Sequence, residues 1–150
     1  MAAVVPADAG EILTLQRAAY VTEAQLYGDV SLPALTQTLE ELRAELTAGI
    51  ALKAVLGQRI VGAVRARVEG AALHVGRLVV APDLQGRGIG GLLLTSVEGR
   101  APAAVDRYAL FTGHLSTANI RLYERRGYRE TRRERLSPAV ELVHLEKPAP

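Results

Sequence analysis

The sequence predicts an α/β protein with one mixed, mostly antiparallel sheet and four helices on its faces. Three apolar segments, 50–56, 60–68 and 71–80, follow one another with only short turns between them, and turns of that length connect antiparallel strands. A glycine-rich loop then leads into an apolar helical segment, 89–98, and on to a further strand. A strand–helix–strand connection of this kind is a right-handed crossover, which pairs its two strands in parallel.

A short strand and two helices are expected before these three strands. The strand covers residues 1–5, and the first helix begins at Asp8, which stands in capping-box spacing with Glu11. That helix ends at the turn-forming segment 27–29. The second helix spans about 33–48, since proline suits a first helical turn. Four leucines give it an apolar face: Leu35, Leu39, Leu42 and Leu46.

The last third of the chain supplies the remaining elements. A strand is expected at 108–112, and a helix that Ser116 caps is expected at 116–126. Two strands, 128–135 and 140–146, close the chain as an antiparallel pair. The 150 residues fit one domain of ordinary size, spanning 1–150.

The composition excludes several kinds of chemistry. The chain has no cysteine, so disulfides, thiolate zinc sites and cysteine nucleophiles are ruled out. Its three histidines, His74, His114 and His144, lie far apart and lack the spacing of metal ligands. We therefore expect no metal site.

The charge pattern does not favour a nucleic acid or a membrane as a partner. The net charge is only +2, and the one basic cluster, 125–135, alternates with Glu130 and Glu134, which partly cancel its field. The N-terminus lacks the pattern of a signal peptide, and no apolar run approaches the ~20 residues that span a bilayer. We therefore expect a cytoplasmic protein.

The segment 80–90, Val-Ala-Pro-Asp-Leu-Gln-Gly-Arg-Gly-Ile-Gly, joins the end of a strand to the start of a helix. Free N–H groups at a helix start, together with the helix dipole, form an anion site suited to phosphate. The three glycines let a diphosphate approach the backbone closely, and Arg87 adds a charge. The segment predicts a phosphate-binding loop, although a tight connection without a ligand has the same pattern.

Two common phosphate loops do not fit this segment. No Lys-Ser or Lys-Thr pair follows its last glycine, which excludes an NTPase P-loop. A dinucleotide-binding loop opens a parallel strand–helix–strand unit, whereas this loop follows an antiparallel set of strands.

With Pro82, Gln85 and its three glycines, the segment 80–90 resembles the acetyl-CoA signature of the GNAT superfamily of N-acetyltransferases. The segment 119–128, Asn-Ile-Arg-Leu-Tyr-Glu-Arg-Arg-Gly-Tyr, is similar to that superfamily's second motif, a helix with a Leu-Tyr-Glu core followed by glycine and an aromatic residue. The resemblance covers essentially the whole chain. It implies a GNAT-like fold in which the strand 71–80 splays from its parallel neighbour, with acetyl-CoA as cosubstrate in the V-shaped cleft between them.

The resemblance also implies which residues contact acetyl-CoA. The backbone at the end of the strand 71–80 is expected to pair with the pantetheine arm, and one of its N–H groups to polarise the acetyl carbonyl. The glycine loop is expected to hold the pyrophosphate. Asn119 either binds the pantetheine or orients Tyr123. The implied contacts are Leu78, Val79, Val80, Gln85, Gly86, Arg87, Gly88, Ile89, Gly90 and Asn119.

The implied reaction is direct transfer, in which a neutral amine attacks the thioester and the CoA thiolate leaves. Tyr123 matches the superfamily's general acid, which protonates that thiolate, although helical spacing alone fits a half-buried core aromatic. Neither 73–80 nor 108–112 contains a glutamate that could act as the base. The base therefore stays open among His74, His114, Glu23, Asp29 and a chain of waters.

The acceptor is expected to be a primary amine of a small molecule or a protein, entering between the first two helices and the last strand pair. Tyr20, Tyr27 and Asp29 are the residues expected to line its site. The alternative function is a GNAT-like module that senses acyl-CoA or docks to a partner without turnover, which the missing glutamate supports. The exposed edge of the last strand pair also suggests a homodimer.

Overall fold

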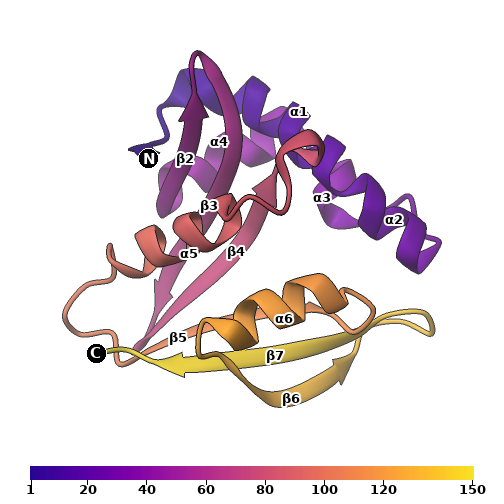
Figure 1. Cartoon of the computed structure of the whole chain (residues 1–150), viewed down its shortest axis with the longest axis vertical. Helices are drawn as coiled ribbons and strands as arrows, with labels where there is room; N and C mark the ends of the chain where they lie inside the picture. Colours follow the sequence, from indigo (N-terminus) through magenta and orange to yellow (C-terminus); the bar gives the residue numbers. More distant parts are fainter.

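In the computed structural model, which describes all 150 residues, a seven-stranded sheet runs through the molecule in the order β1-β2-β3-β4-β5-β7-β6 (Figure 1). Only β4 and β5 pair in parallel, and every other neighbouring pair is antiparallel. The predicted mixed, mostly antiparallel sheet is therefore confirmed. Its strands are β1 (Ala2–Ala3), β2 (Ile50–Leu56), β3 (Arg59–Glu69), β4 (Ala72–Val80), β5 (Arg107–Gly113), β6 (Arg129–Arg135) and β7 (Glu141–Pro148).

Each of the four helical segments expected from the sequence is present, but the first two are divided. The first forms α1 and α2, which meet at Tyr20, and the second forms α3 and α4, which are separated by Gln37 and Thr38. None of the helices has the length and apolar character that crossing a membrane requires. The helices are α1 (Ala9–Ala19), α2 (Val21–Tyr27), α3 (Pro33–Thr36), α4 (Leu39–Ala48), α5 (Ile89–Glu98) and α6 (Thr117–Arg125), with two short 3-10 turns, η1 (Pro6–Asp8) and η2 (Pro82–Leu84).

The backbone at Gln37 divides the second helical segment. Gln37 has an extended conformation (ψ 133°), so helical hydrogen bonds cannot continue through it. Thr38 then caps α4 in a capping box: its Oγ1 accepts from the Glu41 N–H at 3.2 Å, and Glu41 Oε1 accepts from the Thr38 N–H at 2.9 Å. The regular leucine spacing continues across this break, which is why it did not reveal the break.

The capping box expected at Asp8 and Glu11 is wrong. Asp8 already has helical dihedral angles as the last residue of η1 (φ −77°, ψ −14°), and its side chain makes no capping hydrogen bond to α1. Its carboxylate instead accepts from the Val5 N–H at 2.8 Å and forms an ion pair with Lys53 at 2.6 Å. Glu11 accepts from the Ile60 N–H at 2.7 Å. Both carboxylates thus tie the first helix to neighbouring segments.

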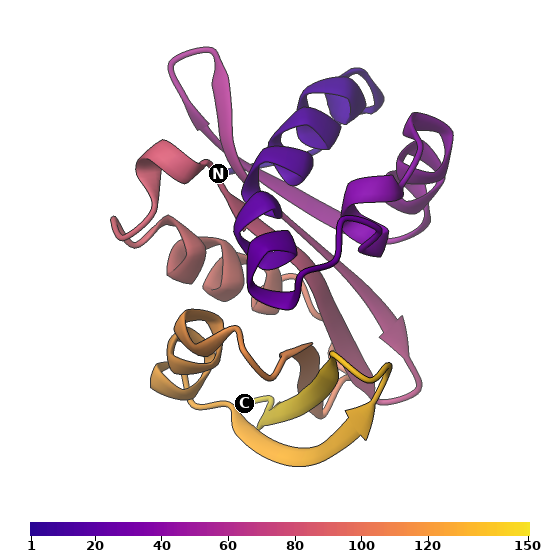
Figure 2. The same ribbon diagram turned by 90° about the vertical axis from the view of Figure 1, so that its right-hand side faces the viewer.

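Helices cover both faces of the sheet (Figure 2). The helices α1 and α4 pack on one face of β2, β3 and β4, and α5 packs on the other face of these strands. The helix α6 lies on the same side as α5, over β5 and β7. Gly62 on β3 allows α5 to approach, because a Cβ at this position would lie 2.7 Å from Leu93 Cδ1.

The strands β4 and β5 separate soon after they begin. They pair at only three positions, from Ala72–Arg107 to His74–Ala109. Further along β4, Arg77 has a left-handed conformation (φ 51°) where the register between β3 and β4 shifts. Such a bulge bends a strand locally. The last residues of β4 consequently have no strand partner on the side of β5.

Candidate active site

An open cleft of about 540 Å³ lies where β4 and β5 separate. Its walls come from four parts of the chain: the junction of α1 and α2, the last residues of β4, the loop into α5, and the segment from β5 into α6. These parts are far apart in the sequence. The parallel crossover and the division at Tyr20 together bring them around one space.

The loop into α5 has the conformation of an anion-binding loop. Gly86 (φ 79°) and Gly88 (φ 85°) are both left-handed, a conformation that glycine adopts without strain. The Gly88 carbonyl accepts from the Leu92 N–H at 3.1 Å, so the N–H groups of the next three residues have no partner within α5. No side chain caps them. The cleft wall therefore contains an uncapped, partly positive helix end.

Most of the predicted loop residues line this wall. They are Gln85, Gly86, Gly88, Ile89 and Gly90. The side chain of Arg87 is exposed and does not line the cleft. Gln85 also has a structural role, since its Nε2 donates to the Val80 carbonyl at 3.3 Å and so fastens the loop to the end of β4.

The end of β4 presents a backbone N–H to the cleft. The Ala81 N–H donates to the Val61 carbonyl at 2.8 Å, which directs Ala81 toward β3. Because successive residues of a strand direct their backbone groups to opposite neighbours, the N–H and C=O of Val80 face the side of β5, where no strand pairs with them. The Val80 carbonyl accepts a hydrogen bond from Gln85, and the Val80 N–H is left available to a ligand in the cleft. The predicted contacts Leu78, Val79 and Val80 all line the cleft.

The helix α6 forms the opposite wall. The predicted contact Asn119 lines the cleft, and so do Leu122 and Arg125. These three residues follow one another at a spacing of three, which places them on one helix face. Arg125 was not identified as a cleft residue from the sequence, although its spacing from Asn119 was a signal that the two share a helix face.

Tyr123 combines a buried ring with an open hydroxyl. The ring packs on Tyr128 with centroids 6.0 Å apart. Burial, with smaller contributions from Tyr20 and Glu23, raises the pKa of Tyr123 well above its usual value of 10.0, so the phenol is protonated at neutral pH. Its hydroxyl has no hydrogen-bond partner in the protein. That oxygen is not fully buried, because no fully buried polar side-chain atom is unpaired in this structure, but Tyr123 does not itself line the cleft.

Only one of the groups left open as a base lines the cleft, and it is Glu23. Asp29 is engaged by hydrogen bonds from Ser31, which lower its pKa. His74 lies near the turn between β3 and β4, where it faces a glutamate at 3.4 Å. His114 accepts a backbone hydrogen bond from the start of β7 at 3.0 Å. These three side chains lie outside the cleft.

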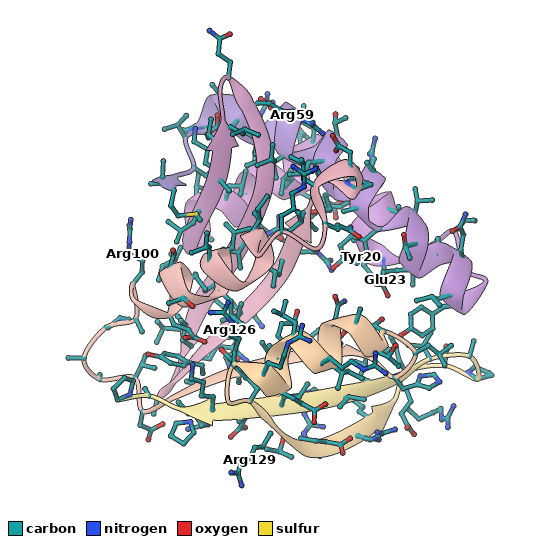
Figure 3. All side chains as sticks on the ribbon, in the orientation of Figure 1. Tyr20, Glu23, Arg59, Arg100, Arg126 and Arg129 are labelled. Atoms are coloured by element: carbon teal, nitrogen blue, oxygen red, sulfur yellow. The ribbon has the colours of Figure 1, made fainter.

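Tyr20 and Glu23 project from the α1–α2 junction toward α6 (Figure 3). Of the residues expected around the acceptor, Tyr20 lines the cleft, whereas Tyr27 and Asp29 do not. The division of the first helical segment at Tyr20 therefore contributes to the site.

Three side chains connect α2 to the start of α6. The Tyr27 hydroxyl accepts from the Leu115 N–H at 3.0 Å and lies 2.9 Å from Ser116 Oγ, and Ser116 in turn donates to Glu23 at 2.5 Å. The absence of a side chain at Gly113 makes room for the Tyr27 hydroxyl. The expected role of Ser116 is wrong: it stands at the N-cap of α6 but makes no capping bond, because its hydroxyl is engaged in this chain.

The fold and the cleft agree with comparisons to known families. Residues 23–148 match the family model described as the acetyltransferase (GNAT) domain. The chain therefore belongs to the GNAT acetyltransferase family, and the resemblance noted in the sequence is confirmed. A comparison with curated protein sequences gave no match.

Solved structures of this family share the fold at low sequence identity. The ribosomal-protein-S18-alanine N-acetyltransferase from Escherichia coli has a TM-score of 0.80 and 16% identity, over 99% of this chain and 92% of that chain. The PaiA N-acetyltransferase from Thermoplasma acidophilum in complex with coenzyme A has a TM-score of 0.79 and 14% identity, over 97% and 95%. A GNAT family acetyltransferase from Elizabethkingia anophelis with acetyl-CoA bound has a TM-score of 0.66 and 22% identity, over 75% and 84%.

Proposed function

We propose that this chain, as one domain over residues 1–150, is an acetyl-CoA-dependent N-acetyltransferase of the cytoplasm. The observation that carries the proposal is a single cleft lined by two chemically different groups. The uncapped N–H groups at the start of α5 suit a diphosphate. The Glu23 carboxylate beside Tyr20 suits an amine. A cleft that holds both can bring an acyl donor and an amine together.

Acetyl-CoA serves as the cosubstrate. The loop from Gln85 to Gly90 holds its pyrophosphate, and the pantetheine arm follows the β4 backbone from Leu78 to Val80, with Asn119 on the opposite wall. The Val80 N–H then donates to the acetyl oxygen and stabilises the negative charge that develops there. The bound acetyl-CoA and coenzyme A of two structural neighbours support this assignment.

The transfer is a direct reaction between acceptor and thioester. The amine nitrogen attacks the acetyl carbon, a C–N bond forms, and the C–S bond breaks, so that sulfur leaves as a thiolate. Tyr123 gives its proton to that sulfur and regains one from solvent through its open hydroxyl. The proton lost by the amine passes to a base in the cleft.

The acceptor is a primary amine of a small molecule or of a protein. The E. coli neighbour is a ribosomal-protein-S18-alanine N-acetyltransferase, which supports the inclusion of a protein amine among the acceptors to be tested. Fold alone does not decide between these acceptors, so a panel of amines is needed.

The test is the release of free thiol from acetyl-CoA with phenethylamine, spermidine and a short peptide with a free N-terminus, with the melting temperature measured on the same protein. Binding to the folded state raises the melting temperature by mass action. We expect a shift with acetyl-CoA and turnover of at least one amine. No shift with acetyl-CoA or CoA would overturn the cofactor assignment.

The alternative is a module that binds acyl-CoA or docks to a partner without turnover. One observation favours it: neither β4 nor β5 contains a carboxylate. A melting shift with acetyl-CoA but no thiol release with any amine would favour this alternative over the enzyme.

We also propose that the chain forms a homodimer. The strand β6 lies at the edge of the sheet, and all of its residues are exposed, so its backbone is open to pairing with a second copy. Light scattering across the micromolar range checks this assembly, and a monomer throughout would contradict it.

A further inference from the structure

We propose that Glu23 takes the proton from the acceptor's ammonium group, and that Ser116 and Tyr27 are positioning residues that hold Glu23 for this step. The inference rests on the proposed function and adds a base to it. Glu23 is the only acidic residue that lines the cleft, and Arg125 is the only basic one. A cationic acceptor in this cleft therefore has one anionic partner.

The hydrogen bonds of the chain have a fixed direction. Ser116 donates its only proton to Glu23 Oε2, so the Tyr27 hydroxyl must donate to Ser116 and, in turn, accepts from the Leu115 N–H. Each donor thus points toward the carboxylate. The chain of donors ends on Glu23 Oε2 and fixes the carboxylate in place.

The second carboxylate oxygen of Glu23 is free. Oε1 has no hydrogen-bond partner in the protein, and Glu23 forms no ion pair with any lysine, arginine or histidine. Tyr20 from the α1–α2 junction and Arg125 from α6 also line the cleft. Tyr123 is close enough that, besides burial, Tyr20 and Glu23 raise its pKa, and Arg77 stands over the Tyr20 ring at 6.0 Å. No cationic side chain of the protein pairs with Glu23, so a cationic acceptor can bind beside it.

The two positioning residues are buried. Ser116 is 4% exposed and Tyr27 is 9% exposed, and the Tyr27 hydroxyl fills the space left by the missing side chain of Gly113. Glu23 itself is only partly buried. A partly exposed carboxylate on a buried support can meet an incoming amine without losing its orientation, as the first requirement for proton transfer is geometry.

Two exposed leucines flank Glu23 in the cleft and narrow the class of acceptor. Leu26 is 46% exposed and Leu115 is 42% exposed, and both line the cleft. Covering large exposed apolar side chains with an apolar ligand removes their surface from water, which lowers the free energy of the complex. The acceptor is accordingly a primary amine with an apolar group next to its ammonium, rather than a polyamine with several charges.

The proton transfer completes the reaction. One N–H proton of the ammonium moves to Glu23 Oε1, and the freed lone pair attacks the acetyl carbon of acetyl-CoA. As the C–S bond breaks, sulfur takes the Tyr123 proton, and the nitrogen, now bonded to the acetyl carbon, loses its second proton to solvent to become the neutral amide. Glu23 then releases its proton to solvent, and Tyr123 takes one up, so the enzyme returns to its starting state.

The test compares two acceptors that differ in basicity but hardly in shape, phenethylamine and β,β-difluorophenethylamine. The fluorinated amine is a much weaker base, so it needs little help in losing a proton at neutral pH. We expect Glu23→Gln to lower kcat/KM with phenethylamine about 100-fold, within the range of general base effects, and to lower it by less than about threefold with the fluorinated amine. Ser116→Ala and Tyr27→Phe should produce the same selectivity, with smaller losses.

Controls separate this role from a structural one. Glu40→Gln, on the exposed surface of α4, should change neither rate, and every variant should keep the melting shift with acetyl-CoA. Equal losses for both amines in Glu23→Gln would overturn the role of Glu23 while leaving the proposed function standing. Absence of thiol release by the wild-type protein with every amine tested would overturn both.

Discussion

The two ends of the cleft are built from different kinds of groups. At the end proposed to bind the cofactor, the groups that face the cleft are backbone N–H groups of β4 and of the first turn of α5. At the acceptor end they are side chains, Glu23 and Tyr20 from the first helices, with Ser116 behind them. The cofactor end depends on chain conformation, and the acceptor end depends on the chemistry of a few residues.

This difference separates the effects of substitution at the two ends. A backbone site tolerates many side chains as long as the dihedral angles and the open space are kept. A side-chain site tolerates almost no change in the residues that act, but its surroundings can vary.

The largest effect is expected from Gly88→Val. Nothing lies within 4 Å of a Cβ at Gly88, so the added side chain enters the cleft, where the pyrophosphate is proposed to lie. We expect affinity for acetyl-CoA to fall by at least about 100-fold, or ~2.7 kcal/mol, measured by calorimetric titration.

The control for that variant is Gly57→Val. Gly57 also has a positive φ (64°) and open space around its Cβ position, but it lies in the turn between β2 and β3. Both variants therefore introduce a branched residue into a left-handed conformation. If the two variants bind acetyl-CoA with the same affinity, backbone strain and not the ligand site explains any loss of affinity. The proposal that the backbone of this loop binds the pyrophosphate would then be wrong.

The next effect concerns Tyr123, the proposed proton donor. Tyr123→Phe keeps the buried ring and removes only the open hydroxyl. We expect kcat to fall about 100-fold, at the low end of general acid effects, with unchanged affinity for acetyl-CoA, because the lost interaction belongs to the transition state. Turnover within about threefold of wild type would show that Tyr123 only packs.

A third variant removes the hydroxyl from the neighbouring ring. Tyr128 donates to the buried Glu98 at 2.7 Å, and Glu98 is also held by Lys147 at 3.1 Å. Tyr128→Phe takes one partner from a buried carboxylate, which costs about 1–3 kcal/mol of folding stability. Denaturant unfolding should show this loss with kcat unchanged. A kcat loss as large as that of Tyr123→Phe would mean that the pair of rings, and not the Tyr123 hydroxyl, affects the reaction.

The smallest effect is expected from Arg87→Ala. Arg87 is exposed and lies outside the cleft lining, and an exposed charge contributes little to binding. We expect the affinity for acetyl-CoA to fall by less than about fivefold, a loss that shrinks further at high salt. A loss as large as that of Gly88→Val would show that a side-chain charge, rather than the helix N-terminus, binds the pyrophosphate.

The conformation of the loop at the proposed cofactor end could be predicted from the sequence because its determinants are contiguous. The segment 80–90 contains the strand end, the glycines with positive φ and the first turn of α5. The crossover to β5 followed from the order of the elements and is confirmed by the parallel pairing. A conformation that is encoded within eleven consecutive residues can be recognised from the sequence.

The acceptor end could not be assembled in the same way. Glu23 and Ser116 are 93 positions apart, and only the folded sheet places them at hydrogen-bond distance. Ser116 was expected to cap α6, which local spacing favours, but its hydroxyl bonds to Glu23 instead. The helix breaks at Tyr20, and α2 is directed toward the cleft, although no glycine or proline stands at this position to signal the break. Tertiary contacts decide these positions, so local rules miss them.

The most direct test of the account is a crystal structure of the chain with acetyl-CoA bound. We expect pyrophosphate oxygens on the N–H groups at the start of α5, and an acetyl oxygen about 2.7–3.1 Å from the Val80 nitrogen, as for an oxyanion donor. The acetyl carbon should then face the space beside Glu23. Acetyl-CoA bound outside this cleft, or with its thioester directed away from Glu23, would contradict the account.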